Sequence, residues 1–280
     1  MNNITDTVKH LIIINILFFV GSELMSKKVQ ELIGIDLKEL LSLHYFESAK
    51  FRFWQPLTHM FMHGGIMHIA FNMFALFSFG SMLENMFGWK KFLFFYISCG
   101  LGAALLHTGI QYFELQNVLN EILDLKLSDE TLNLLLNANG IDGDYFRSDL
   151  YFKNAIPILE NSNKISLLNE INSESLLNAA KINQSLMVGA SGAIYGLLVA
   201  FAFMFPNAEL MMMFIPVPIK AKYFVPGILV IDLILGLKGN SIFGGNGTGI
   251  AHFAHIGGAL IGFLMMWFWK KNSFDNKRWN

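Results

Sequence analysis

Six stretches of this 280-residue chain are apolar enough to cross a lipid bilayer, or nearly so. A membrane-spanning helix needs about 20 mostly apolar residues, because the hydrocarbon core is about 30 Å thick. The fifth stretch is the shortest and contains Asp232, so it is the least regular of the set. The six expected spans are residues 9–26, 57–83, 91–112, 186–205, 223–238 and 251–269.

The composition agrees with a membrane protein. Hydrophobic residues make up 54% of the chain and charged residues only 15%, which is too apolar for an ordinary soluble domain. The net charge of −1 gives no reason to expect nucleic acid, and a single cysteine, Cys99, excludes an intrachain disulfide. Lys9 and the apolar run after it resemble a signal peptide, but Glu23, Lys27 and Lys28 follow without a cleavage pattern. We therefore expect an all-α polytopic membrane protein, a bundle of six helices that begins with this run.

Two polar segments interrupt the apolar pattern. Residues 27–56 place leucine and isoleucine at helical spacing and predict an interfacial helix rather than a span. Residues 113–185 carry eleven acidic and five basic side chains. They separate segment 1–112, with the first three spans, from segment 186–280, with the last three. Ser128 to Thr131 indicates a capped helix that ends near Gly140, and residues 166–180 indicate another. We expect a partly helical insertion outside the membrane; the simpler alternative is a tolerated loop without catalytic duty.

The lysines predict the orientation. With six spans, most basic clusters fall on one side, so the positive-inside rule places both termini in the cytoplasm and the insertion outside. Some basic residues between the first two spans fall on the other side and oppose this reading. The supporting residues are Lys9, Lys90, Lys91, Lys220, Lys222, Lys270, Lys271, Lys277 and Arg278; the opposing ones are Lys27, Lys28, Lys50 and Arg52.

Polar side chains inside a membrane are costly and usually functional. Ser191 lies in the small-residue run 189–196 at the head of the fourth span. A helix N-terminus presents free N–H groups, so the backbone N–H of Ser191 can stabilise an oxyanion there. The alternative is a small-residue packing face between helices. The run is not the elbow of soluble hydrolases, because position 193 is alanine.

Two histidines compete for the role of general base to Ser191. His255 is followed by Gly258 and Gly262, whose spacing suits close contact with another helix. A neutral imidazole next to Ser191 can accept its proton and later deliver it to a leaving amine. His252, one turn earlier, is equally available on sequence alone, and either histidine can instead bond a backbone carbonyl.

His68 and Asn72 share one helix face and can both donate hydrogen bonds, which suits an oxyanion hole. No acidic residue looks well placed to orient His255, although Asp232 and Glu84 are candidates. We therefore expect a Ser–His dyad rather than a Ser–His–Asp triad. Tyr195 lies four residues after Ser191, close enough on the same face to stack on the imidazole.

A metal site is the main alternative for the histidine-rich set. His59 and His63 have the spacing of zinc-protease ligands, but position 60 is Met where a Glu is needed, and no acidic or thiolate ligand accompanies them. We expect neither metal nor cofactor. The glycine-rich run 244–249 lacks the spacing and βαβ context of a phosphate loop and predicts a flexible outside loop.

At these residues the chain resembles the rhomboid family of intramembrane serine proteases. The matching segments are residues 53–65 (FWQPLTHMFMHGG), 67–72 (MHIAFN), 83–88, 189–192 (GASG) and 254–258 (AHIGG), in the order and spacing of the family. Two departures stand out: Trp54-Gln55 replaces a common Trp-Arg pair, and the 113–185 insertion has no counterpart in the six-helix form.

The resemblance implies that Ser191 is the nucleophile and His255, rather than His252, its base. It also implies that His68 and Asn72 help form the oxyanion hole, that Tyr195 packs on His255, and that His59 and His63 are structural. The expected activity is cleavage of membrane proteins in or near their membrane segments, without a cofactor. The insertion can gate or recruit substrate.

A catalytically silent relative that binds membrane clients is the alternative, against which the presence of both Ser191 and His255 argues. A transporter would need repeats or a polar pathway, which the sequence lacks. The absence of a transit-type leader favours a bacterial inner membrane.

Overall fold

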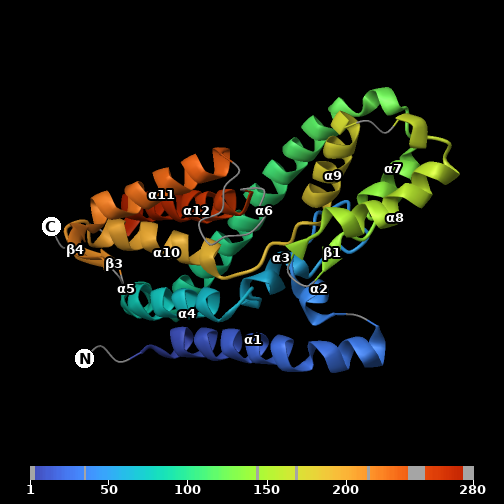
Figure 1. Ribbon diagram of the computed structural model, residues 1–280. Coiled ribbons are helices and arrows are strands. Elements are labelled where there is room, and N and C mark those ends of the chain that lie inside the picture. The colour runs from blue at the N-terminus through green and yellow to red at the C-terminus, as the bar shows by residue number, and fades with distance from the viewer. Residues whose placement is uncertain are drawn as a thin grey trace.

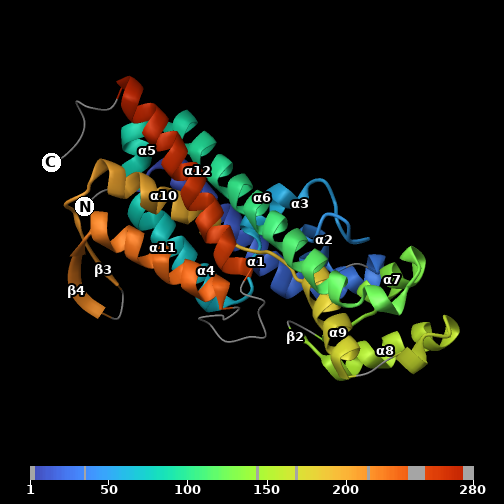
Figure 2. The ribbon, with the colours of Figure 1, turned by 90° about the horizontal axis from the view of Figure 1, so that it is seen from above.

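The computed structural model describes residues 4–34, 36–142, 145–167, 170–212, 215–238 and 250–273, and most of these are helical. Figures 1 and 2 show a helical bundle from which one long helix, α6, runs out to a smaller subdomain. The bundle helices are α1 (Asp6–Ile33), α4 (Ile66–Ala75), α5 (Ser81–Phe87), α6 (Trp89–Glu121), α10 (Ser191–Met204), α11 (Ala221–Leu237) and α12 (Ile250–Ser273). A π-helical turn, η2 (Leu76–Gly80), joins α4 to α5.

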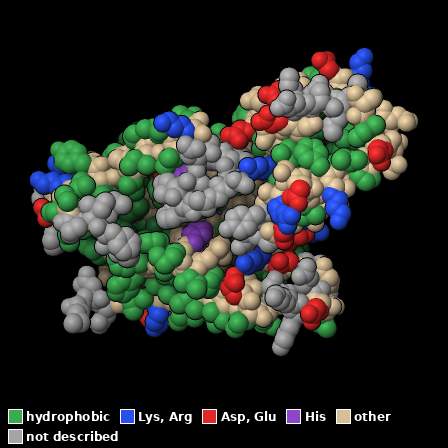
Figure 3. Space-filling model, in the orientation of Figure 1, with side chains coloured by type: hydrophobic (Ala, Val, Ile, Leu, Met, Phe, Trp, Pro, Cys, Tyr) green, Lys and Arg blue, Asp and Glu red, His purple; other side chains and the backbone are tan. Residues whose placement is uncertain are grey.

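The centre of the bundle is the contact of α6, α10 and α12. Their buried apolar side chains merge with those of α1, η2 and α5 into one cluster, which includes Leu76, Leu83, Phe92, Phe95, Tyr96, Leu197 and Met266. Large apolar side chains also cover the outside, among them Phe94, Leu105, Phe113, Leu260 and Trp267. Figure 3 shows this hydrophobic surface over the bundle, whereas many of the charged side chains gather over the subdomain. An apolar exterior around an apolar core is what a lipid solvent requires.

Within the described residues, four helical stretches are long and apolar enough to cross a membrane: Asp6–Met25, Ile66–Phe87, Trp89–Glu121 and Ala251–Trp269. α10 is apolar but only 14 residues long, and α11 has 17 residues. The helical membrane fold predicted from the sequence is therefore confirmed, whereas the count of six spans is not.

One predicted boundary was wrong. The second span begins at Ile66 rather than residue 57, because Gly64 and Gly65 separate it from a short helix α3 (Gln55–Thr58) and a 3₁₀ turn η1 (His59–Phe61). Pro56 lies in the first turn of α3, where a missing N–H costs nothing. Helix α6 continues past residue 112, the predicted end of the third span, to Glu121 and carries the insertion. The expected interfacial helix is split between the end of α1 and a short α2 (Leu37–Leu41).

The insertion forms a small helical subdomain at the far end of α6 (Figure 1). Its helices have their own core, with Leu135, Tyr151, Leu159 and Leu176 each at most 1% exposed. The predicted capped helix is confirmed, because the Ser128 hydroxyl accepts a hydrogen bond from the Thr131 N–H at 3.2 Å. The elements are η3 (Leu123–Leu125), α7 (Asp129–Leu136), β1 (Ile141–Asp142), β2 (Tyr145–Phe146), α8 (Ser148–Asn161), η4 (Ile165–Leu167) and α9 (Glu170–Gln184).

Two small antiparallel sheets complete the fold. In the subdomain, β1 and β2 pair Ile141 with Phe146. Between α10 and α11, strands β3 (Glu209–Met212) and β4 (Ile215–Lys220) form a hairpin that pairs Glu209 with Lys220 and Leu210 with Ile219. The hairpin lies at the opposite end of the bundle from the subdomain (Figures 1 and 2).

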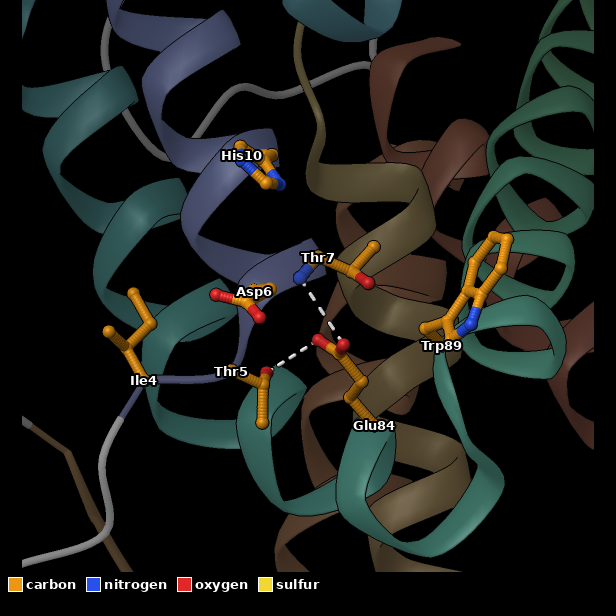
Figure 4. Close-up of a pocket in the computed structure, with 7 residues that line it drawn as sticks. All are labelled: Ile4, Thr5, Asp6, Thr7, His10, Glu84 and Trp89. Atoms are coloured by element: carbon orange, nitrogen blue, oxygen red, sulfur yellow. Dashed lines mark hydrogen bonds between the residues drawn. The ribbon is translucent and has the colours of Figure 1, made fainter.

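Glu84, which the sequence offered as a partner for His255, instead caps the N-terminus of α1. Its carboxylate accepts hydrogen bonds from the backbone N–H groups of Thr7 at 3.2 Å and Val8 at 3.1 Å, and from the Thr5 hydroxyl. Figure 4 shows the carboxylate pointing across to the first turn of α1, beside a cavity of about 510 Å³. The first N–H groups of a helix have no partner within the helix, and a negative charge there is favourable.

Replacing Glu84 with alanine is expected to destabilise the fold, because it leaves buried N–H groups of Thr7 and Val8 without an acceptor. The expected loss is about 1.5–3 kcal/mol. Cys99 is the one cysteine in the sequence and is fully buried, so a thiol-reactive dye can follow thermal unfolding in detergent. Glu31→Ala, at an exposed glutamate of the same helix, is the control and should leave the unfolding midpoint within error. Equal midpoints for both variants would show that the cap adds no stability.

Candidate active site

Ser191 is the first residue of α10, and the chain enters it through a strained turn. Gly189 adopts φ +112°, a conformation that residues with a Cβ rarely take. Its N–H donates a hydrogen bond to the His59 carbonyl at 2.9 Å, which fixes the turn against η1. Ser191 is half-buried, so its hydroxyl lies within the bundle but stays reachable.

Glycines bring α10 and α12 into backbone contact. A Cβ on Gly258 would overlap the carbonyl of Gly192, and one on Gly262 would lie 2.8 Å from the Cα of Gly196. These two pairs are spaced one helical turn apart on both helices, which is the small-residue pattern of close helix packing. His255 lies one turn before Gly258, so the close contact carries its ring up to Ser191.

The rings of His255 and Tyr195 and the hydroxyl of Ser191 form a compact group. His255 Nε2 lies 2.9 Å from Ser191 Oγ, within hydrogen-bond distance. The Tyr195 ring stacks on the imidazole with centroids 4.2 Å apart and planes inclined by 7°. The structure thus brings together three residues that the sequence singled out, one pair by hydrogen bond and the other by stacking.

A carboxylate faces the ring nitrogen of His255 that points away from Ser191. The expectation that no acidic residue is placed to orient this histidine was therefore wrong. Asp232 Oδ1, from α11, lies 3.2 Å from His255 Nδ1. The same oxygen lies 2.6 Å from Nδ1 of His252. The Asp232 side chain is only 3% exposed. The sequence did carry a signal, since Asp232 is the one acidic residue in its apolar stretch, but the rotation of α11 could not be inferred from it.

His68 lies on the other side of the Ser191 turn. A Cβ at Gly189 would come within 2.8 Å of His68 Nε2, so the ring occupies the space that this glycine leaves open. His68 Nδ1 accepts a hydrogen bond from the Gly64 N–H at 3.3 Å. A neutral imidazole that accepts at Nδ1 carries its proton at Nε2. That proton therefore faces the turn that holds Ser191.

Asn72 is buried one helical turn after His68. Its side-chain nitrogen donates to the His68 carbonyl at 2.8 Å. This bond uses one of the two amide N–H groups and anchors the side chain on the same face as the His68 ring. The second N–H of the amide group remains for another acceptor.

The other conspicuous histidines lie apart from the base. The Nδ1 of His59 donates to the Gln55 carbonyl at 3.1 Å, and the His63 ring packs edge-on against His68 at 5.1 Å.

Among the described residues, the one group with metal-ligand geometry is Asp232, His252 and His255, whose donor atoms lie within 4.8 Å of one another. Two N–H···O hydrogen bonds already account for that proximity. The glycine-rich run 244–249 lies outside the described residues.

Comparison with known proteins gives one family. The family model of the rhomboid domain matches residues 50–114 and 166–272. The unmatched residues 115–165 include most of the subdomain. An uncharacterised mitochondrial rhomboid protein of Schizosaccharomyces pombe is 27% identical over 230 residues, covering 79% of this chain and 53% of its own. The rhomboid protease AarA of Providencia stuartii is 30% identical over 162 residues, which cover 54% of this chain and 56% of AarA. The chain spans about half the length of these two relatives.

Gly258→Val is expected to separate α12 from α10, because the side chain would overlap the Gly192 carbonyl. The reactivity of Ser191 toward a fluorophosphonate should then be lost, and the unfolding temperature should fall. Gly109→Ala is the matched control: a Cβ at this glycine of α6 meets nothing within 4 Å. Alanine there should raise stability by about 0.5–1 kcal/mol. Wild-type reactivity in Gly258→Val would mean that the glycine contact does not position the site.

Proposed function

The chain belongs to the rhomboid family, and from this premise we propose that it is an intramembrane serine endopeptidase with Ser191 as nucleophile and His255 as general base. It is an integral membrane protein with several passes. The observation that carries the proposal is the 2.9 Å distance between His255 Nε2 and Ser191 Oγ. A nucleophile and a base within hydrogen-bond distance, with the base held by further groups, is the arrangement that activates a serine.

In the proposed reaction, Ser191 Oγ attacks the carbonyl carbon of the scissile peptide bond. Its proton passes to His255 Nε2, which then protonates the leaving nitrogen as the C–N bond breaks. The product is an ester between the acyl part of the substrate and Ser191. A water molecule then attacks this ester, giving one proton to Nε2, and the proton returns to Oγ as the acid is released. Base catalysis of this kind is typically worth about 10²–10⁴-fold.

The oxyanion of each tetrahedral intermediate needs donors that are already in place. The Nε2–H of His68 faces the turn before Ser191, and the Ser191 N–H lies at the start of α10, where the helix supplies no acceptor. Asn72 has one amide N–H to spare beyond its bond to His68. In a site with little water, such fixed donors stabilise developing charge more strongly than solvent would.

The proposed substrates are other membrane proteins, cut in or near a transmembrane segment. A helical substrate hides its carbonyls in hydrogen bonds four residues apart, so it must unwind locally to reach Ser191. The proposed orientation has both termini in the cytoplasm and the subdomain outside, and the proposed location is a bacterial inner membrane. One of the two named relatives is mitochondrial, so the choice of membrane rests on the sequence alone.

A catalytically silent, client-binding protein is the competing function. A pure binder has no need to hold a serine hydroxyl against an imidazole, and the pair also needs the close glycine contacts of α10 and α12. These features favour the enzyme.

Ser191→Ala is expected to abolish cleavage of a transmembrane substrate in proteoliposomes, since the acyl-enzyme can no longer form. The fold should survive, because the change removes one oxygen from a half-buried position. His255→Ala should abolish cleavage and fluorophosphonate labelling together. Unfolding monitored through Cys99 reports whether each variant is folded. Cleavage that persists in folded Ser191→Ala would overturn the proposal, and wild-type protein that binds clients without labelling would favour the silent alternative.

His68→Ala and Asn72→Ala test the oxyanion hole. Each should lower kcat with little change in KM, because the donated bonds strengthen only as charge develops on the carbonyl oxygen. Losing one donor costs about 10²–10³-fold in a soluble protease, and the remaining donors should reduce the loss here. Steady-state kinetics with a fluorogenic transmembrane peptide gives both constants. A rise in KM alone would assign these residues to substrate binding.

A further inference from the structure

The buried carboxylate behind His255 has no role in the two-residue mechanism. Asp232 comes from α11, and its Oδ1 lies 3.2 Å from His255 Nδ1 and 2.6 Å from His252 Nδ1. The ring of Tyr195 stacks on the imidazole of His255. We infer that Asp232 is a positioning residue that completes a Ser191–His255–Asp232 chain, with His252 holding the carboxylate in place. This inference rests on the hydrolysis proposed above.

The tautomer of His255 gives the first argument. To take the proton of Ser191, Nε2 must be the unprotonated nitrogen, so the ring proton must be on Nδ1. A stacked tyrosine ring holds the plane of the imidazole but does not distinguish its two nitrogens. An acceptor at Nδ1 does, and Asp232 Oδ1 is at that position. The carboxylate therefore selects the tautomer that makes His255 a base toward Ser191.

Charge gives the second argument. When His255 accepts the serine proton it becomes a cation inside an apolar bundle, where an unpaired charge is strongly unfavourable. A carboxylate within hydrogen-bond distance of Nδ1 offsets this charge as it forms, and the proton stays on the imidazole. Tyr195 contributes no formal charge, and the remaining facing groups are His252 on α12 and His68 on α4. Within the described residues, Asp232 is thus the one group facing His255 that carries a negative charge.

His252 explains how the carboxylate keeps its place. Its hydrogen bond to Oδ1 is the shorter of the two, and its side chain is only 9% exposed. The bond to His252 therefore holds Asp232 while the ring of His255 turns slightly between Ser191 and the leaving nitrogen. Gly236, one turn after Asp232, permits this arrangement: a Cβ there would lie 3.3 Å from that of His252 and 3.0 Å from the Phe253 ring. The close approach of α11 to α12 is thus built around the carboxylate.

If Asp232 only formed a structural ion pair with His252, substituting it would leave turnover per folded molecule unchanged. If Asp232 positions His255, turnover per folded molecule should fall. The decisive variant is Asp232→Asn, which keeps the shape but can present N–H groups to Nδ1 and so favour the wrong tautomer. Asp232→Glu retains the carboxylate. Glu84→Gln is the matched control, because it removes a buried carboxylate that caps α1 and lies outside the proposed site.

The variants are compared as full-length protein in proteoliposomes, in buffer with EDTA, with rates normalised to the folded fraction. Asp232→Asn should lower kcat by more than about tenfold and leave KM within about twofold. The upper limit of the loss is what a general base contributes, about 10²–10⁴-fold. Fluorophosphonate labelling should slow in parallel, and Asp232→Glu should recover part of the rate. His252→Ala should show an intermediate loss. Glu84→Gln should lower the unfolding midpoint and keep wild-type turnover.

Nitrogen-15 spectra of histidine-labelled protein give a readout that does not depend on activity. Wild-type His255, assigned by its absence in His255→Ala, should carry its proton on Nδ1, and Asp232→Asn should move it to Nε2. A proton on Nε2 in the wild type, or normal kcat in folded Asp232→Asn, would overturn the inference. So would loss of wild-type activity in EDTA with rescue by zinc, because the three side chains would then be metal ligands.

An inactive, unlabelled wild type would refute the proposed function alone, and the spectra would still decide the role of Asp232. If Asp232→Asn does not fold, the wild-type spectrum and Asp232→Glu decide it.

Discussion

The site depends on one constraint, the backbone contact between α10 and α12. In a lipid solvent, apolar side chains gain little by leaving the lipid for a neighbouring helix, so helices associate through close packing and hydrogen bonds. Gly192 and Gly196 on one helix meet Gly258 and Gly262 on the other at distances that no larger residue permits. This contact fixes the relative height and rotation of the two helices. A serine at the start of α10 and a histidine one turn before Gly258 are then brought within 2.9 Å.

The same logic extends to the outer elements. Gly189 lets the His68 ring approach the Ser191 turn, and Gly236 lets α11 approach α12 beside His252. His68, His255 and Asp232 thus each lie beside a close contact between two segments that a glycine permits. Bulk apolar packing supplies the surroundings, as in the cluster of Phe92, Phe95 and Leu197.

The sequence identified the residues of the candidate site better than their partners. Ser191, His255, His68 and Asn72 were identifiable because polar groups in apolar helices are rare and their spacing is informative. Asp232 was noted but not paired, because its partners lie 20 and 23 residues away on another helix. Local pattern does not reveal which faces of two helices meet. The role of Glu84 was missed for the same reason: the N-terminus of α1, which it caps, lies 76 to 79 residues away in the chain.

Boundaries failed where local chemistry and hydropathy disagree. Residues 57–65 are apolar enough to extend a span, yet Gly64 and Gly65 end the helix before Ile66. Helix α8 escaped prediction because its polar residues and internal Pro157 weaken the helical pattern, and its packing through Tyr151 and Leu159 outweighs them. The membrane orientation cannot be obtained from packing at all, since it depends on charge outside the bundle.

The length of α6 has a consequence for the position of the subdomain. At about 1.5 Å per residue, its 33 residues extend about 50 Å, whereas the hydrocarbon core is about 30 Å thick. About 20 Å of rigid helix therefore remains to hold the subdomain away from the lipid. An extended polypeptide covers that height with about six residues, at about 3.3 Å each. The helix is thus a fixed spacer between the apolar bundle and the subdomain.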